Sequence, residues 1–383
     1  MTAARPAPPR PRAPLLGRDL RLIYASNFTG AFGDGLLLYL LPYYLTKHVG
    51  ASAVEVGALY TASSLTSAAT LLAGGAIADR FDRKKVILAG WLAWLPAPLL
   101  LALAESWAQA LVGMVLWGFW ISGPAYAAYV LSSASGDRLA AAFATLSSSW
   151  SLGYALSPAI GGGIAEALGV RSVFYVTFAL YAASCLVVSF ISSRPPPSSP
   201  GRHSLRALLR RGPLLLLAAF ALVSFATSMF RQFIPVFLAE AYGYGGLQIG
   251  LVGSASFLGS AALGVALGRL GDRLGRARAL AASSLLCCCS LAVVPLTGDL
   301  RAVLVAALLL GASYAAWPLM MAALGPLAPE GARARWASVL QAAVMLASFP
   351  APYVGGLLYS ASPPSLFAAS IAILLPTSIL LLR

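Results

Sequence analysis

Long apolar stretches, separated by short polar breaks, dominate the sequence from residue 20 to residue 382. An apolar stretch of 18 or more residues with few charges predicts a membrane-spanning helix, because about 20 helical residues cross a hydrocarbon core about 30 Å thick. The pattern therefore predicts an all-α membrane protein with twelve transmembrane helices. These cover residues 20–46, 53–78, 86–104, 107–132, 140–165, 172–193, 213–239, 247–267, 279–297, 301–325, 335–359 and 365–382.

Two polar, proline-rich segments lie outside these stretches. Residues 1–18 are rich in Pro and Arg and lack the apolar core of a signal peptide, so we expect a disordered cytoplasmic tail. Residues 194–212 separate the sixth predicted helix from the seventh, and we expect a cytoplasmic linker there. The predicted domains are thus an N-terminal six-helix bundle at 19–193 and a C-terminal one at 213–383.

The two halves carry the same landmarks at nearly one spacing. The matching positions, 193 or 194 residues apart, are Asp79 and Asp272, Pro42 and Pro235, Pro124 and Pro318, and Pro158 and Pro352. Each pair falls in or beside corresponding helices of the two halves. Because six helices return each half to the side where it began, the repeats run parallel and are related by an axis along the membrane normal.

Composition supports a lipid environment and decides how the net charge is interpreted. The chain is 59% hydrophobic and 10% charged, whereas soluble domains carry about 25% charged residues. Its mean hydropathy is +0.82. With both termini in the cytoplasm, only Lys47, Arg171, Arg231 and Arg301 lie elsewhere, so 22 of the 26 basic residues are cytoplasmic. This is the positive-inside bias of membrane proteins, so the net charge of +14 predicts topology and no nucleic-acid partner.

Several kinds of chemistry lack the residues they require. Cys185 and the run Cys287, Cys288 and Cys289 fall inside predicted helices without metal-ligand spacing, so no metal site is expected. The sequence contains neither a phosphate-binding Gly-x-x-x-x-Gly-Lys-(Ser/Thr) loop nor a His-Glu-x-x-His pair. These two observations argue against a primary pump and against an intramembrane enzyme.

A short charged loop follows the second predicted helix and returns after the eighth. It runs from Gly75 through Asp79-Arg80 to Arg83, and its copy runs from Gly268 through Asp272-Arg273 to Arg276. The doubled Gly-x-x-x-Asp-Arg pattern resembles the signature loop of the major facilitator superfamily, which lies between helices 2 and 3 with a weaker copy between helices 8 and 9. The resemblance covers the chain after residue 18, and it implies two pseudo-symmetric bundles that rock around a central path.

The same resemblance implies that the loops form a latch that holds the cytoplasmic ends of the halves together in the outward-open state. The glycines are expected to allow close approach of a neighbouring helix. The two aspartates lie at helix C-termini, where the helix dipole disfavours an anion, so each should contact an arginine or a helix N-terminus. Asp82 departs from the family pattern, in which glycine is usual. The predicted gating residues are Gly75, Asp79, Arg80, Arg83, Gly268, Asp272, Arg273 and Arg276.

Two ionisable residues lie well inside predicted spans, Asp34 in the first helix and Arg231 in the seventh. Asp34 precedes Pro42 by eight residues and Arg231 precedes Pro235 by four, which differ by about one helical turn. We therefore expect both side chains to meet across the substrate path. Three interpretations remain open: a structural ion pair, a carboxylate that titrates during transport while Arg231 tunes it or holds an anionic group, and a residue that snorkels to the membrane edge.

Further polar and aromatic residues fall on the first, fourth, seventh and tenth helices, which the resemblance places around the central cavity. As a group they predict an amphipathic organic substrate. With Asp34 and Arg231, the predicted pathway residues are Asn27, Tyr39, Trp120, Tyr126, Gln232, Tyr314 and Trp317.

The fifth helix carries a small-residue motif that indicates a direction of transport. The segment from Gly153 through Pro158 to Gly161-Gly162 resembles a motif of proton-coupled efflux antiporters, although Ser157 replaces one glycine. It returns in the eleventh helix as Pro352, Gly355 and Gly356, which suits helix packing as well as efflux. Against efflux, the fourth helix carries no arginine, whereas drug–proton antiporters commonly have one there.

The sequence thus predicts a secondary transporter of a small organic solute, most simply a proton-coupled exporter. An uptake symporter for an organic anion and a non-transporting membrane sensor stay as alternatives. We expect a multi-pass monomer in the cell membrane that contacts membrane lipids and its small-molecule substrate, with the proton as coupling ion and without a cofactor or metal.

Overall fold

The computed structural model describes residues 16–133, 139–195, 211–327 and 333–382. The described residues form helices joined by short turns and contain no strand. The N-terminal half comprises α1 (Arg18–Leu38), α2 (Leu40–Lys47), α3 (Ala53–Ala78), α4 (Arg83–Trp94), α5 (Ala97–Leu103), α6 (Trp107–Trp117), α7 (Ser122–Ser133), α8 (Leu139–Leu168) and α9 (Val170–Ser189).

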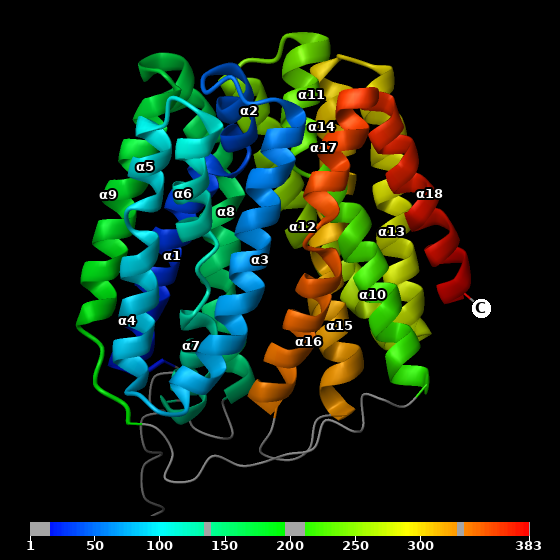
Figure 1. Ribbon diagram of the computed structural model, residues 1–383. Coiled ribbons are helices and arrows are strands. Elements are labelled where there is room, and N and C mark those ends of the chain that lie inside the picture. Colours follow the sequence, from blue (N-terminus) through cyan, green and yellow to red (C-terminus); the bar gives the residue numbers. More distant parts are fainter. Residues whose placement is uncertain (1–15, 134–138, 196–210, 328–332, 383) are drawn as a thin grey trace, which may run out of the picture.

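The C-terminal half repeats this order with more interruptions. It comprises α10 (Arg211–Phe230), α11 (Phe233–Tyr242), α12 (Gly246–Leu274), α13 (Arg276–Val293), η3 (Val294–Leu296), α14 (Leu300–Leu310), η4 (Gly311–Ala315), α15 (Ala316–Leu324), η5 (Gly325–Leu327), α16 (Arg333–Ser348), α17 (Ala351–Ala361) and α18 (Pro363–Leu382). The two halves stand side by side (Figure 1). We call the side where α1 begins the lower side and the side where α2 and α11 end the upper side. Most of the predicted tail and linker, residues 1–15 and 196–210, lies outside the described residues.

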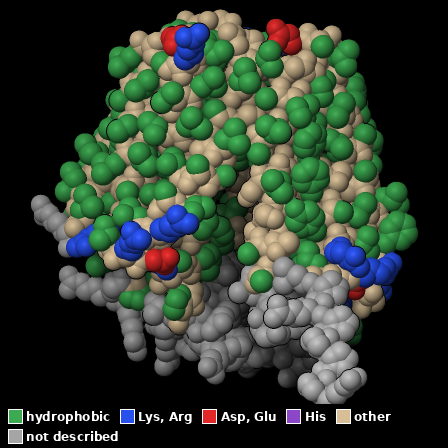
Figure 2. Space-filling model, turned by 180° about the vertical axis from the view of Figure 1, so that it is seen from behind, with side chains coloured by type: hydrophobic (Ala, Val, Ile, Leu, Met, Phe, Trp, Pro, Cys, Tyr) green, Lys and Arg blue, Asp and Glu red, His purple; other side chains and the backbone are tan. Residues whose placement is uncertain are grey.

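Ten helical segments of the described chain are long and apolar enough to cross a membrane. The two other predicted spans, 20–46 and 140–165, are also helical and correspond to α1 with α2 and to α8. They are less apolar because they carry serine, glycine and other polar residues toward neighbouring helices. Hydrophobic side chains cover the middle of the outer face, and Lys and Arg lie toward its upper and lower edges (Figure 2). The protein is therefore an all-α, multi-pass membrane protein.

Two equivalent prolines interrupt the first helix of each half. A proline lacks the N–H that would bond the carbonyl four residues earlier. For Pro42 that carbonyl belongs to Leu38, and for Pro235 it belongs to Arg231. The helices break at these positions, between α1 and α2 and between α10 and α11. The 193-residue repeat thus places Arg231 at the position that Leu38 holds in the first half.

A second pair of prolines acts in the same way in the fourth helix of each half. The carbonyls freed by Pro124 and Pro318 belong to Trp120 and Tyr314, which are also equivalent. Trp120 lies in the irregular turn between α6 and α7, and Tyr314 lies in η4. The four prolines therefore set four irregular turns on the helices that face the centre of the molecule.

The halves meet on the upper side along two seams. In the α8–α12 seam, Gly250 packs against the backbone of Pro158, and the N–H of Ala159 donates a 3.1 Å hydrogen bond to Oγ of Ser254. In the α3–α17 seam, Gly57 packs against the backbone of Pro352, and the next residue, Tyr353, donates to Oγ1 of Thr61 at 3.1 Å.

These two seams are copies of one another under the sequence repeat. Offsets of 193 or 194 residues relate every member of one seam to a member of the other: Gly57 to Gly250, Thr61 to Ser254, Pro158 to Pro352, Ala159 to Tyr353, and Gly162 to Gly356. Gly162 and Gly356 face backbone of α12 and α3 across the seams. The close approach depends on the absence of a side chain, so glycine at these positions holds the halves together on this side.

Substitution of Gly250 by Ala should open the α8–α12 seam. The added methyl group would overlap the carbonyl of Pro158, and overpacking of about 1–3 kcal/mol changes a two-state population about 5- to 150-fold. Spin labels at the exposed positions 167 and 241, on a cysteine-free background, should move apart in electron paramagnetic resonance distance measurements. Gly163→Ala is the control, because a methyl group there meets nothing within 4 Å. Equal distance distributions in both variants would contradict the role of the seam.

Candidate functional site

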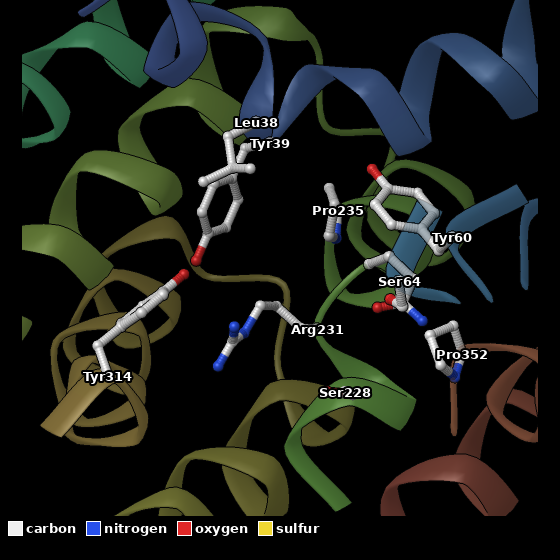
Figure 3. A pocket seen from close by; sticks show the side chains of 10 residues that line it. Leu38, Tyr39, Tyr60, Ser64, Ser228, Arg231, Pro235, Tyr314 and Pro352 are labelled. Carbon is white, nitrogen blue, oxygen red and sulfur yellow. The ribbon is translucent and has the colours of Figure 1, made fainter. Parts of the chain in front are cut away.

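An inner cavity of about 220 Å³ lies between the halves, directly below the α3–α17 seam. Its walls come mostly from the irregular turns set by prolines. They include two pairs of equivalent residues, Leu38 with Arg231 and Tyr39 with Gln232. The lining residues are Leu38, Tyr39, Tyr60, Ser64, Ser228, Arg231, Gln232, Pro235, Tyr314 and Pro352 (Figure 3).

An outer cavity of about 760 Å³ lies toward the lower side. Five tryptophans give it a largely apolar, aromatic wall. The lining residues are Asn27, Leu71, Trp91, Trp94, Trp120, Ser122, Gly123, Pro124, Tyr126, Ala127, Phe143, Ser147, Trp150, Trp317, Met321 and Gln341. Tyr314 of the inner cavity and Trp317 of the outer one are three residues apart, about one helical turn, so the cavities are neighbours. A furrow separates the halves in the lower part of Figure 2.

Asp34 projects from α1 into the N-terminal half, where three neutral donors hold its carboxylate. The indole Nε1 of Trp117 donates to Oδ1 at 2.8 Å, and the hydroxyl of Tyr181 donates to the same oxygen at 2.9 Å. The hydroxyl of Tyr154 donates to Oδ2 at 2.6 Å. The donors come from α6, α9 and α8, so the carboxylate ties three helices of one half to α1. No cation forms an ion pair with Asp34 among the described residues.

Arg231 lies at the break between α10 and α11, and its guanidinium carbon is 4.6 Å from the ring centroid of Tyr314. A cation–π contact contributes about 0.5–2 kcal/mol, whereas a charge at the centre of a membrane costs about 2.5–3.5 kcal/mol on insertion scales. The ring therefore offsets only part of the cost of the charge. The rest favours an anion or water at the guanidinium edge, which has no carboxylate partner among the described residues.

The predicted meeting of Asp34 with Arg231 does not occur in this structure. We expected the meeting because Asp34 and Arg231 differ by one helical turn in their distance from equivalent prolines. They are not equivalent residues, however, because the repeat relates Arg231 to Leu38 and Asp34 to Thr227. Asp34 precedes the break at Tyr39 and points toward helices of its own half. Of the three interpretations, the direct ion pair is absent from the described residues.

A stack of aromatic rings connects the two charges instead. Tyr154, which donates to Asp34, stacks on Phe257 of α12 with ring centroids 4.9 Å apart. Phe257 stacks on Tyr314 at 5.0 Å, and Tyr314 carries Arg231 on its face. The stack crosses from one half to the other between α8 and α12. Figure 3 shows the Arg231 end of it, beside Tyr39.

Eight of the nine predicted pathway residues line one of the two cavities. The inner cavity has Tyr39, Arg231, Gln232 and Tyr314, and the outer cavity has Asn27, Trp120, Tyr126 and Trp317. Asn27 donates a 3.0 Å hydrogen bond to the hydroxyl of Tyr126. Neither lining includes Asp34, whose donors the sequence reasoning missed. A search for Tyr and Trp at the depth of Asp34 on the other helices of its half would have found them.

The residues of the predicted helix-packing motif divide into two sets. Gly162 and Gly356 lie in the seams, as do Pro158 and Pro352. The others pack within a half: Gly153 against Ala31 and Phe32, Gly161 against Leu36, and Gly355 against Met229. Leu36 and Met229 are again 193 residues apart, so the motif holds α8 to α1 in the same way that it holds α17 to α10.

The gating loops differ from expectation in two respects. A side chain on Gly75 or Gly268 would meet nothing within 4 Å, so neither glycine marks the close approach we expected. Gly74 does, because it faces backbone at Ile121. Successive residues of a helix point about 100° apart, so Gly74 faces the turn at Ile121 while Gly75 faces away from it.

The two loops also differ from each other in their ion pairs. The carboxylate of Asp272 forms an ion pair with Arg276 of the same loop at 2.5 Å, which is the contact with an arginine that we expected. The carboxylate of Asp79 has no hydrogen-bond or ion-pair partner within the described ranges. The backbone N–H of Arg83 donates to the carbonyl of Arg194 at 2.9 Å. Arg80 and Arg273 are exposed. The latch role of these residues stays a prediction, because no ion pair between described residues joins the two loops.

Asp82, which departs from the family pattern, begins α4. Its Oδ1 accepts a 3.2 Å hydrogen bond from the N–H of Lys85, and its Oδ2 accepts one from the hydroxyl of Ser193. Burial alone raises the pKa of Asp82, but the hydrogen bonds from Ser193 and from nearby backbone N–H groups outweigh burial and lower the pKa below its ordinary value. The carboxylate therefore caps α4 and ties it to the end of the N-terminal half.

Comparison with known proteins agrees with this geometry. The family model of the Major Facilitator Superfamily matches residues 23–252 and 216–383, which together cover nearly the whole chain. The chain belongs to the Major Facilitator Superfamily. The doubled loop, the paired bundles and the central cavities are thus those of a transporter of this superfamily.

Relatives in sequence include proteins named Multidrug resistance protein MdtG. The chain is 28% identical to the one from Enterobacter lignolyticus over 284 residues, 70% of this chain and 67% of that protein. It is 28% identical to the one from a Rahnella species over 283 residues, 69% of this chain and 68% of that protein.

Solved structures of the superfamily share the fold. The nucleoside transporter NupG aligns over 95% of this chain and 99% of its own, with a TM-score of 0.78 and 11% identity. The human organic anion transporter MFSD10 aligns over 96% and 100%, with a TM-score of 0.66 and 17% identity.

Replacement of Asp82 by Ala should lower the stability of this superfamily member by about 1 kcal/mol at neutral pH, the usual cost of a lost N-cap. Because the folded pKa is lowered, the contribution is present above the ordinary aspartate pKa of about 3.9 and is lost as pH falls through the lower folded value. The check is the unfolding midpoint of both proteins across this pH range. A difference that grows toward acid pH would contradict the role of the carboxylate.

Proposed function

We propose that the protein exports small organic molecules from the cell in exchange for protons, by alternating access of the central cavities to the two sides of the cell membrane. With the lower side in the cytoplasm, as the distribution of Lys and Arg predicts, the sealed upper side makes this conformation inward-facing. Substrate then enters the outer cavity from the cytoplasm and reaches the inner cavity below the seams. The names of the MdtG relatives support export rather than uptake.

The observation that carries proton coupling is the carboxylate of Asp34, held by three neutral donors. A carboxylate in an ion pair resists protonation, because its partner charge would be left uncompensated. Asp34 has no such partner among the described residues, so it can gain and lose a proton without stranding a second charge. A membrane-embedded acid of this kind is a natural carrier for a coupling proton.

The donor set also suggests which oxygen takes the proton. An indole N–H can only donate, so Trp117 keeps Oδ1 as an acceptor. A tyrosine hydroxyl can both donate and accept. Protonation at Oδ2 would therefore turn the hydroxyl of Tyr154 from donor to acceptor.

That change at Tyr154 would act on the interface between the halves. The ring of Tyr154 is the first member of the stack that crosses to Phe257 and Tyr314. A rearranged Tyr154 would shift its contact with Phe257 beside the α8–α12 seam. In this mechanism protonation of Asp34 shifts the equilibrium between the closed and the open α8–α12 seam, and the state of the seam determines which side of the membrane the cavities face.

Gradient-driven flux in proteoliposomes tests the proposal. The probes are anthracene-2-carboxylate and anthracene-2-carboxamide, and protein-free liposomes report passive movement. Antiport predicts accumulation when the lumen is acidic, because protons leave as the probe enters. Neither probe accumulates passively in an acidic lumen, since one is a weak acid and the other is neutral.

Asp34→Asn should reduce accumulation to the level of protein-free liposomes while downhill exchange of the probe persists. Glu240→Gln is the matched control, because Glu240 is another carboxylate bound by a tyrosine, at 2.7 Å from the hydroxyl of Tyr359. Full gradient-driven accumulation in Asp34→Asn would refute the coupling role. Accumulation above the protein-free level only with an acidic exterior would favour the uptake symporter, and flux of neither probe in either direction would count against this class of substrate.

A further inference from the structure

Two polar atoms that line the inner cavity are buried without a hydrogen-bond partner among the described residues. They are the hydroxyl of Tyr60 and the Nε2 of Gln232, whereas the hydroxyls of Tyr39 and Tyr314 point toward each other (Figure 3). Gln232 is 7% exposed, so bulk water does not satisfy it. Buried polar groups are nearly always paired, and each exception calls for an explanation. Two unpaired polar groups in the wall of one cavity indicate a polar ligand.

The charged residues that line the cavity predict the sign of the charge on that ligand. The ten described residues that line it include one cation, Arg231, and no carboxylate. The face of the guanidinium lies on the ring of Tyr314, which leaves its N–H edges for a second partner. The paired N–H groups of a guanidinium edge suit a carboxylate, and the Nε2 of Gln232, which lines the same cavity, adds a further donor. The cavity is therefore complementary to an anionic head group.

The outer cavity specifies the rest of the ligand. Its tryptophans come from both halves, four from the N-terminal half and Trp317 from the C-terminal half. Within this wall the ring centroids of Trp94 and Trp120 lie 5.1 Å apart. Trp150 continues the ring contacts inward, with its centroid 6.2 Å from that of Tyr154. An aromatic or apolar ring system buried here gains both area and stacking.

We infer that the two cavities form one bipartite site for an amphipathic organic anion, with its carboxylate-type head on Arg231 and Gln232 and its ring system against the tryptophans of the outer cavity. A bare inorganic anion would leave the outer cavity unused. A neutral or cationic amphiphile would leave Arg231 without a counter-charge. The inference names the substrate class of the transporter proposed above and rests on it only for the biological role of binding.

Binding without any proton gradient tests the site separately from coupling. The purified full chain in nanodiscs is titrated with anthracene-2-carboxylate and with anthracene-2-carboxamide, which share the ring system and differ in charge. Anthracene absorbs where tryptophan emits, so energy transfer from the outer tryptophans reports occupancy. The carboxylate should bind about tenfold or more tightly than the carboxamide, as expected for hydrogen bonds to a charged group.

Arg231→Gln should remove this preference, because it should lower the affinity for the carboxylate probe about 10- to 100-fold while the carboxamide probe still binds. Arg231→Lys should keep part of the preference, because it keeps the charge but loses the planar fork. Arg301→Gln, at an exposed position of α14, removes the same charge outside the site and should change nothing. Trp317→Ala should weaken both probes to a similar degree and preserve the preference.

Equal binding of the two probes by the unmodified protein would overturn the inference, as would an undiminished preference in Arg231→Gln. If Arg231→Gln bound neither probe, Gln232→Leu would decide. A selective loss of the carboxylate in that variant supports the site, and an equal loss of both probes overturns it. Failure of proton coupling would appear in the gradient experiment with Asp34→Asn and would leave these binding results unchanged.

Discussion

The structure depends on the close contact of glycine with backbone at the two upper seams. Gly57 and Gly250 let α3 and α12 approach the prolines of the opposite half, and a side-chain hydroxyl on each of these helices accepts from the N–H that follows the proline. Two central features lie next to these contacts. The inner cavity lies directly beneath one of them, and the aromatic stack crosses beside the other.

Proline placement explains why the cavity has the residues it has. Pro42, Pro235 and Pro318 free carbonyls at Leu38, Arg231 and Tyr314, and the irregular turns at these positions form walls of the inner cavity. The scaffold is thus symmetric while its chemistry is not. Equivalent turns present an apolar Leu38 in one half and the cation Arg231 in the other.

Much of this could be predicted from the sequence, because apolar length and the repeated prolines are local signals. Those signals predict the spans and the two halves. The resemblance to the superfamily adds which helices face the centre, and eight of the nine residues chosen on them line a cavity. The partners of Asp34 could not be predicted in this way. The direction of a side chain from α1 depends on how α6, α8 and α9 pack around it, and that packing is not visible in spacing along one helix. For the same reason Gly75 was expected at a close approach that Gly74 makes instead.

The duplicate construction of the seams has a consequence for how the halves move apart. Two seams of equal geometry, related by an axis along the membrane normal, share one load when one bundle tilts against the other. If one seam opened while the other stayed closed, a six-helix bundle would have to twist. The two seams are therefore expected to open cooperatively, so that a substitution that weakens one seam also weakens the other. Under the alternating access proposed above, the two seams would open together, and this would limit leakage through a partly open seal.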